Sequence, residues 1–254
     1  MKLHSLEFGE GQVFIIIHGL FGYSDNWVSF AKKIASFYKV VLLDMRNHGH
    51  SPWSDDFSYS LMAQDVKEYV VSKNYKNIIL MGHSMGGKVA IEFSKEAGHL
   101  IEKLIVVDIG IKKYPVHHQQ ILAGLHAVKL SPTLDRKMAE KQLSEYIDSE
   151  GVKMFLLKNL FWNTQKQLAW RMNLEAIENS MENILEEIKF SKIITIPTLF
   201  MRGSLSNYIV EEDIFNIEEV FVDVQFKKIE NAGHWIHAEK PQEFLNSVLE
   251  FCLR

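Results

Sequence analysis

Short apolar runs along the chain alternate with longer stretches in which apolar residues recur every three or four positions. The first pattern predicts buried strands, and the second predicts amphipathic helices. The predicted strands are residues 3–8, 13–17, 40–43, 78–81, 104–107, 197–201 and 224–228. Strands that alternate with helices in this way form a mostly parallel sheet with helices on both faces. The predicted fold class is therefore α/β.

The alternation is interrupted between residues 111 and 190. Helical patterns follow one another here without intervening strands, over residues 116–128, 134–147, 152–160 and 168–188. Because the α/β pattern resumes afterwards, we expect one core formed by residues 1–110 and 191–254, with a helical cap inserted at residues 111–190. In the core, Ser60 is expected to cap the helix that follows it, and Pro241 is expected to open the C-terminal helix.

A Gly82-x-Ser84-x-Gly86 motif lies where one predicted strand meets the next helical pattern. A strand that turns into a helix this abruptly holds the residue at the apex in a strained conformation. Glycines on either side of the serine remove Cβ atoms that would collide in so tight a turn. The turn would expose the Ser84 hydroxyl at the carboxyl end of the sheet, where open α/β sheets bind ligands. Ser84 is therefore the candidate nucleophile.

A serine nucleophile needs a histidine as general base and an acid that orients this histidine. His234 follows the last predicted strand and is the candidate base, with His237 as the alternative. The loop after the penultimate predicted strand carries no carboxylate. Asp108 ends the strand that follows the helix of Ser84, and a right-handed crossover would bring it to the same edge of the sheet. Asp108 is the candidate acid, with residues 211–213 as the alternative.

The tetrahedral intermediate of such a reaction also needs backbone N–H donors for its oxyanion. Met85 begins the helix after the nucleophile, where the helix dipole favours negative charge. Leu20 lies in a loop with two glycines, residues 18–22, after the neighbouring strand. We expect the N–H groups of Met85 and Leu20 to form the oxyanion hole, and His18 to brace the loop by hydrogen bonding.

Other polar and aromatic residues compete for a role. A polar cluster after another predicted strand is interpreted as mainly structural and consists of Asp44, Arg46 and His48. Three histidines of the predicted cap are interpreted as surface or pocket-lining residues: His117, His118 and His126. The candidate substrate-pocket residues are Phe21, Trp53, Tyr208 and Trp235.

Composition argues against several other classes of protein. The 254 residues are 47% hydrophobic and 24% charged, as in an ordinary globular protein. A net charge of −4 offers no basic surface for nucleic acid. No apolar stretch approaches the roughly 18 residues of a membrane span, and the N-terminus lacks the apolar run of a signal peptide. The single cysteine, Cys252, reads as a packing residue and suits a reducing compartment, so we expect a cytoplasmic protein.

With these residues assembled, the chain resembles the α/β-hydrolase superfamily, and more narrowly the YbfF-like esterases and their mitochondrial relatives. The resemblance runs nearly the whole length of the chain and rests on residues 18–22 with 25–27, 44–52, 82–88, 107–109 and 231–241. It implies an acid at the position of Asp108. It also implies a later loop of the form Gly-x-x-Ser-x-Tyr or Gly-x-x-Ser-x-Phe, to which Gly203–Tyr208 corresponds. The implied activity is hydrolysis of short acyl esters or thioesters under a helical cap.

The resulting hypothesis is a serine carboxylesterase that forms an acyl-enzyme with a Ser84–His234–Asp108 triad. We expect a monomer or homodimer that acts on a small-molecule ester, with no metal or organic cofactor, no nucleic acid and no membrane. Two alternatives stay open. One is a C–C bond hydrolase or lyase of a small carboxylated metabolite, which an inward-facing arginine cluster of Arg136 and Arg171 would favour. The other is a small-molecule receptor that hydrolyses its ligand slowly.

Overall fold

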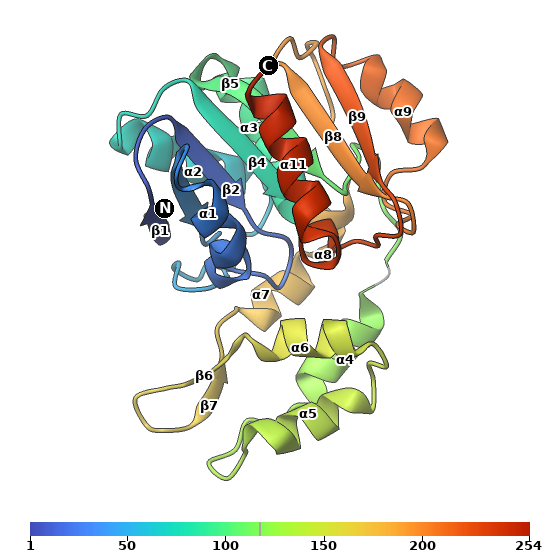
Figure 1. Cartoon of the computed structure of the whole chain (residues 1–254). Helices are drawn as coiled ribbons and strands as arrows, with labels where there is room; N and C mark the ends of the chain where they lie inside the picture. Colours follow the sequence, from blue (N-terminus) through green and yellow to red (C-terminus); the bar gives the residue numbers. More distant parts are fainter. Residues whose placement is uncertain (117) are drawn as a thin grey trace.

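The computed structural model describes residues 1–116 and 118–254. Within these residues one sheet has seven strands (Figure 1). They are β1 (Ser5–Phe8), β2 (Val13–Ile17), β3 (Lys39–Leu43), β4 (Ile78–His83), β5 (Ile101–Val107), β8 (Thr198–Gly203) and β9 (Val224–Ile229). Their order is β1-β3-β2-β4-β5-β8-β9. Only β1 runs antiparallel to its neighbour, so the predicted mostly parallel sheet is confirmed.

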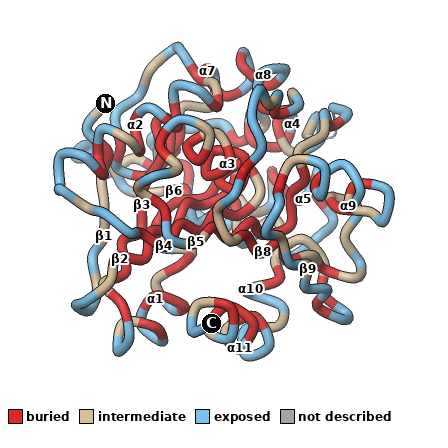
Figure 2. Tube along the Cα trace, turned by 90° about the horizontal axis from the view of Figure 1, so that it is seen from above, coloured by how far each residue is buried: buried red, intermediate tan, exposed pale blue. Residues whose placement is uncertain are grey.

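Helices cover both faces of this sheet (Figures 1 and 2). One face is covered by α1 (Val28–Ile34) and α11 (Pro241–Cys252), and the other by α2 (Tyr59–Ser72), α3 (Met85–Ala97) and α9 (Glu211–Glu218). Short helical turns are η1 (Ser24–Trp27), η2 (Gly98–Leu100) and α10 (Ile236–Glu239). Successive side chains of β2 point to opposite faces: Phe14 and Ile16 pack with α1 and α11, whereas Ile15 and Ile17 pack with α2 and α3.

Between β5 and β8 the chain carries an insert, most of which is the lower body in Figure 1. Its elements are α4 (Gln119–Ala127), α5 (Arg136–Ser144), α6 (Glu150–Leu157), β6 (Leu160–Trp162), β7 (Leu168–Trp170), α7 (Leu174–Asn179) and α8 (Met181–Leu185). β6 and β7 pair as an antiparallel hairpin. The prediction that helices follow one another here without strands is therefore wrong. His117, predicted to belong to the cap, lies outside the described residues.

The helix predicted over residues 168–188 is replaced by β7, α7 and α8. Two asparagines explain this difference, because their side chains bind nearby backbone groups in place of a continuous helix. The Asn163 side chain accepts hydrogen bonds from the N–H groups of Gln165 and Gln167 in the hairpin turn, and the Asn173 side chain accepts one from Ala176 N–H at the start of α7.

The ends of several core elements also test the predictions. Pro241 opens α11 as predicted. The cap of α2 is Ser58 and not Ser60, because the Ser58 hydroxyl accepts the hydrogen bond from Leu61 N–H. Cys252 is a half-buried free thiol at the end of α11. No helix in the described part of the chain has the length and apolar character to cross a membrane.

β4 passes directly into α3 through a single residue, Ser84. The Ser84 backbone has a φ of 53° and a ψ of −121°, a conformation that residues other than glycine rarely adopt. A Cβ atom at Gly82 would collide with the carbonyl oxygen of Gly86, and one at Gly86 would collide with that of Ile17. Both glycines of the motif are therefore required by close backbone contacts.

We predict that Gly86→Ala lowers the free energy of unfolding by about 1–3 kcal/mol, because the new methyl group would overpack against the backbone of β2. Gly151→Ala is the matched control. Gly151 is the second residue of α6, as Gly86 is of α3, but a Cβ there meets no atom within 4 Å. Urea unfolding of both variants checks the prediction, and equal effects would contradict it.

Candidate active site

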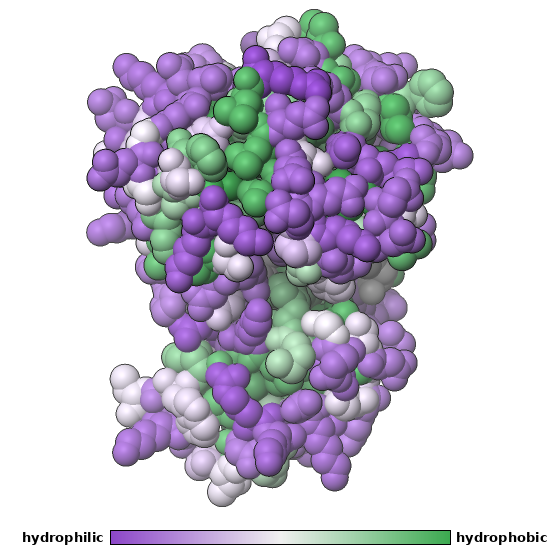
Figure 3. Space-filling model, viewed as in Figure 1, coloured by the Kyte–Doolittle hydropathy of each residue, from purple (hydrophilic) through white to green (hydrophobic). Residues whose placement is uncertain are grey.

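A cavity of about 100 Å³ lies where the insert meets the carboxyl edge of the sheet. Its lining includes Ser84 and His234 from the core, together with Ile121, Val152 and Phe155 from α4 and α6. Figure 3 shows apolar side chains at the waist between the two bodies. Two core residues that are far apart in the sequence thus share one cavity beneath the insert.

Asp108 and His234 are in direct contact beside this cavity. Asp108 is completely buried at the end of β5, and its Oδ2 lies 2.7 Å from Nδ1 of His234. The same carboxylate accepts hydrogen bonds from Gly203 N–H, at 3.0 Å, and from the Ser206 hydroxyl. A carboxylate accepts and does not donate, so we assign the His234 proton to Nδ1. In the neutral imidazole, Nε2 of His234 is then the nitrogen without a proton.

Two further contacts hold His234. The ring of Tyr208 stacks on the His234 ring, with the centroids 4.0 Å apart and the planes at 19°. Nε2 of His83 lies 2.9 Å from the carbonyl oxygen of His234 and therefore acts as the donor in this bond. Burial lowers the pKa of His83 well below its usual value, so His83 is neutral. The imidazole of His234 is thus held through its ring and through its backbone.

The candidate oxyanion donors flank Ser84. Met85 is the first residue of α3, so its N–H has no partner within the helix. Leu20 lines the cavity from the loop after β2. This loop runs close to the serine, because a Cβ added at Gly19 would lie 3.2 Å from Ser84 Cβ. The predicted residues therefore approach the serine from both sides.

The family model described as alpha/beta hydrolase fold matches residues 12–241. The chain belongs to the α/β-hydrolase family.

Three relatives narrow the comparison. Esterase YbfF of Escherichia coli is 32% identical over 93% of this chain and 90% of its own. The sn-1-specific diacylglycerol lipase ABHD11 of Danio rerio is 37% identical over 96% of this chain and 79% of its own. A solved structure titled marine microorganism esterase has 40% identity and a TM-score of 0.96, and the match covers 98% of this chain and 99% of that one. The predicted resemblance to YbfF-like esterases is confirmed. The names of these relatives also support the predicted enzyme class, a carboxylic ester hydrolase.

Within this α/β-hydrolase, two neutral histidines support the loop at residues 18–22. Nε2 of His18 accepts a hydrogen bond from Met45 N–H, and its Nδ1 lies 2.8 Å from the Gly19 carbonyl oxygen. Nε2 of His48 accepts one from Phe21 N–H. Burial lowers the pKa of both imidazoles, that of His48 to about 3. His18 therefore braces the loop as predicted.

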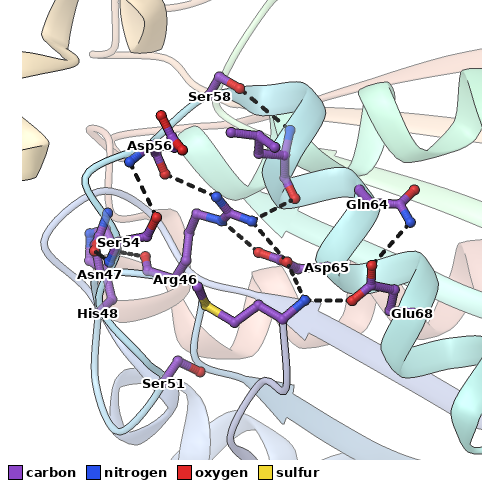
Figure 4. Close-up of polar contacts among 12 residues, drawn as sticks. Arg46, Asn47, His48, Ser51, Ser54, Asp56, Ser58, Gln64, Asp65 and Glu68 are labelled. Carbon is purple, nitrogen blue, oxygen red and sulfur yellow. Dashed lines mark hydrogen bonds and ion pairs between the residues drawn. The ribbon is translucent and has the colours of Figure 1, made fainter.

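The polar cluster after β3 also has structural partners. Asp44 is buried and accepts hydrogen bonds from the N–H groups of Ser24 and His50, at 2.7 and 2.8 Å. Arg46 forms two bonds with the Asp65 carboxylate, at 2.6 and 2.9 Å (Figure 4). These contacts agree with the structural interpretation of the cluster, and they hold the segment that carries His48 against the loop at residues 18–22.

The alternative base and the alternative acids have other partners or lie exposed. The ring of His237 stacks on that of Trp27, with the centroids 4.0 Å apart. Glu211 pairs with Arg202. Asp213 pairs with Lys112 and accepts a hydrogen bond from Val210 N–H at the start of α9. Glu212 is exposed at the start of α9.

Of the predicted pocket residues, Phe21, Tyr208 and Trp235 line the cavity, whereas Trp53 does not. Trp53 follows Pro52 in an exposed loop, and it is 56% exposed. Cavity residues from the insert were missed because no motif marks them: Ile121, Val152, Phe155 and Leu156. Ser206 and His83 had a sequence signal, since both lie inside motifs of the resemblance. In the described residues, no group of three or more histidines, cysteines or carboxylates is arranged to hold a metal ion.

We predict that Ser206→Ala lowers the free energy of unfolding by about 1.5–3 kcal/mol, because a buried carboxylate would lose one of its donors. Ser29→Ala, at an exposed position of α1, is the control and should change it by less than about 0.5 kcal/mol. Urea unfolding at neutral pH measures both variants. A Ser206→Ala variant as stable as the control would contradict the assigned bond.

Proposed function

We propose that the protein is a serine carboxylesterase that hydrolyses short-chain acyl esters through an acyl-enzyme. The observation that carries this proposal is that a strained Ser84 and an Asp108-bound His234 line the same cavity. A serine with a base and an orienting acid is the arrangement of covalent acyl transfer. The relatives named esterase support the reaction class.

In the proposed mechanism, the Ser84 hydroxyl attacks the ester carbonyl carbon while Nε2 of His234 takes its proton. Asp108 stabilises the imidazolium that forms and keeps the proton on Nδ1. The N–H groups of Met85 and Leu20 stabilise the oxyanion. His234 then protonates the leaving alcohol, and it activates a water molecule that releases the acid and regenerates Ser84.

The cavity lining supports a neutral substrate. Among the described residues that line it there is no lysine, arginine, aspartate or glutamate. The two arginines whose inward-facing cluster would favour a carboxylated metabolite have other partners. Arg136 donates to the carbonyl oxygens of Leu157 and Leu160, and Arg171 lies over the ring of Phe161 at 4.5 Å. These contacts argue against the C–C hydrolase or lyase alternative.

A second, smaller cavity supports a short acyl group. This inner pocket, of about 20 Å³, is lined by Leu20, Tyr59, Ser84, Met85, Ile109, Tyr114, His118, Ile184, Leu185 and Tyr208. It shares Ser84 with the larger cavity, and it contains both candidate oxyanion residues. Because one water-sized group needs about 10–15 Å³, an acetyl methyl group fits and a long chain does not. We assign the acyl group to the inner pocket and the alcohol to the larger cavity, with the insert as the cap.

We predict that kcat/KM falls at least about tenfold from p-nitrophenyl acetate to p-nitrophenyl octanoate, because the longer chain exceeds the inner pocket. Ser84→Ala should lower kcat by a factor on the order of 10⁶. Steady-state hydrolysis of an ester series, with thioester analogues beside it, checks both statements. Full activity of Ser84→Ala would reject the mechanism, and negligible turnover of every ester would favour the receptor alternative.

We predict that Asp108→Asn lowers kcat by roughly 10⁴, because an amide at this position favours the wrong tautomer of His234. Asp213→Asn is the matched control, since Asp213 is also a buried aspartate but binds Lys112. Its kcat should stay within about twofold of the wild type. A larger loss in Asp213→Asn, Glu211→Gln or Glu212→Gln would move the acid to α9.

A further inference from the structure

Lys88 is a buried lysine one helical turn after the nucleophile, and the proposed mechanism does not use it. It belongs to α3, and its residue is 0% exposed. Burial lowers the pKa of Lys88 to about 7, although the negative charges of Glu186 and Glu187 act to raise it. Lysine is almost never fully buried unless its ammonium has partners, so these partners indicate what Lys88 does.

The partners of Lys88 lie on the two connections between the insert and the core. Nζ donates to the carbonyl oxygen of Lys112, at 2.8 Å, and to that of Glu186. Lys112 precedes the helices of the insert, and Glu186 directly follows α8, its last helix. One side chain of α3 therefore binds both the entry and the exit of the insert.

These two connections also bind each other. Tyr114 N–H donates to the carbonyl oxygen of Leu185 and Ile188 N–H donates to that of Ile111, both at 2.8 Å. The two paired connections form one unit, and Lys88 binds it. The Lys88 ammonium lies over the ring of Tyr114, 4.9 Å from its centroid, and over that of Tyr59, at 5.5 Å.

The same unit forms one wall of the inner pocket. Tyr114, Ile184 and Leu185 line it together with Tyr59 of α2, and Lys88 does not. The Tyr59 hydroxyl donates to the carbonyl oxygen of Ile184 at 2.6 Å, so this wall has a second tie to the core. The position of this wall relative to Ser84 therefore depends on the hydrogen bonds that Lys88 of α3 donates to the two connections.

We propose that Lys88 is a positioning residue that sets the acyl-chain length of the enzyme by tying both connections of the insert to the helix of the nucleophile. The proposal rests on the proposed esterase function. Lys88 does not touch the acyl group. It keeps the wall that contains Ile184 and Leu185 close to Ser84, so that the inner pocket stays small. Loss of the tie lets this wall move away and admits longer chains.

The test compares the wild type with Lys88→Met, which keeps the length and apolar stem of the side chain but removes its donors. Lys88→Gln keeps two N–H donors on a shorter side chain. Lys67→Met is the control, because Lys67 lies on α2, packed beside α3, and forms a 3.8 Å surface pair with Glu96. The readout is the ratio of kcat/KM for p-nitrophenyl octanoate to that for p-nitrophenyl acetate.

We expect this ratio to rise about tenfold in Lys88→Met, to rise less in Lys88→Gln, and to stay unchanged in Lys67→Met. A merely structural role would lower both kcat/KM values by the same factor and leave the ratio unchanged, and that result overturns the proposal. If Lys88→Met does not fold, as judged by circular dichroism, the ratio in Lys88→Gln decides.

A second measurement does not depend on esterase activity. Hydrogen exchange at the amides of Tyr114 and Ile188, whose bonds pair the two connections, should be at least tenfold faster in Lys88→Met than in the wild type or Lys67→Met. Unchanged exchange would reject the tie itself. If the wild type hydrolyses no ester, the proposed function fails, while the exchange rates still report on Lys88. An active enzyme that depends on Ser84 and keeps its ratio rejects only the role of Lys88.

Discussion

The carboxylate of Asp108 connects the ends of neighbouring strands by hydrogen bonds at the carboxyl edge of the sheet. It is completely buried directly after β5, and it binds Gly203 N–H at the end of β8, Ser206 after β8 and His234 after β9. A buried charge without such donors would cost several kcal/mol. The loops after β8 and β9 are therefore constrained to the positions in which they satisfy Asp108, and the same positions bring His234 to the cavity of Ser84.

Electrostatics separates His234 from the other histidines around this cavity. His18, His83 and His237 also line it, and burial lowers the pKa of each. His234, by contrast, contacts the buried carboxylate of Asp108. The neutral histidines act as hydrogen-bonding and packing groups, as His18 does under the loop that carries Leu20. In the proposed mechanism, the contact between Asp108 and His234 stabilises a proton taken from Ser84.

The insert contributes shape where the core contributes chemistry. Its residues in the larger cavity are apolar apart from His118, and its arginines bind backbone carbonyls or aromatic rings away from that cavity. The insert contacts α3 through Lys88, and in our proposal the inner pocket therefore depends on a side chain that lines neither cavity. Catalysis and acyl selection are thus assigned to different parts of one chain.

The sequence by itself determined the α/β core, because short buried strands, helical periodicity and the glycines around Ser84 are local signals. Chain order and one crossover were enough to nominate Asp108 and His234. Tertiary structure alone decided where Trp53 lies, how Asn163 and Asn173 turn a predicted helix into a hairpin and two short helices, and which residues of the insert reach the cavity. It also decided the role of Ser206 and the burial of Lys88. These features depend on partners distant in the sequence, and a pattern of hydrophobic and polar residues does not record which groups a side chain meets.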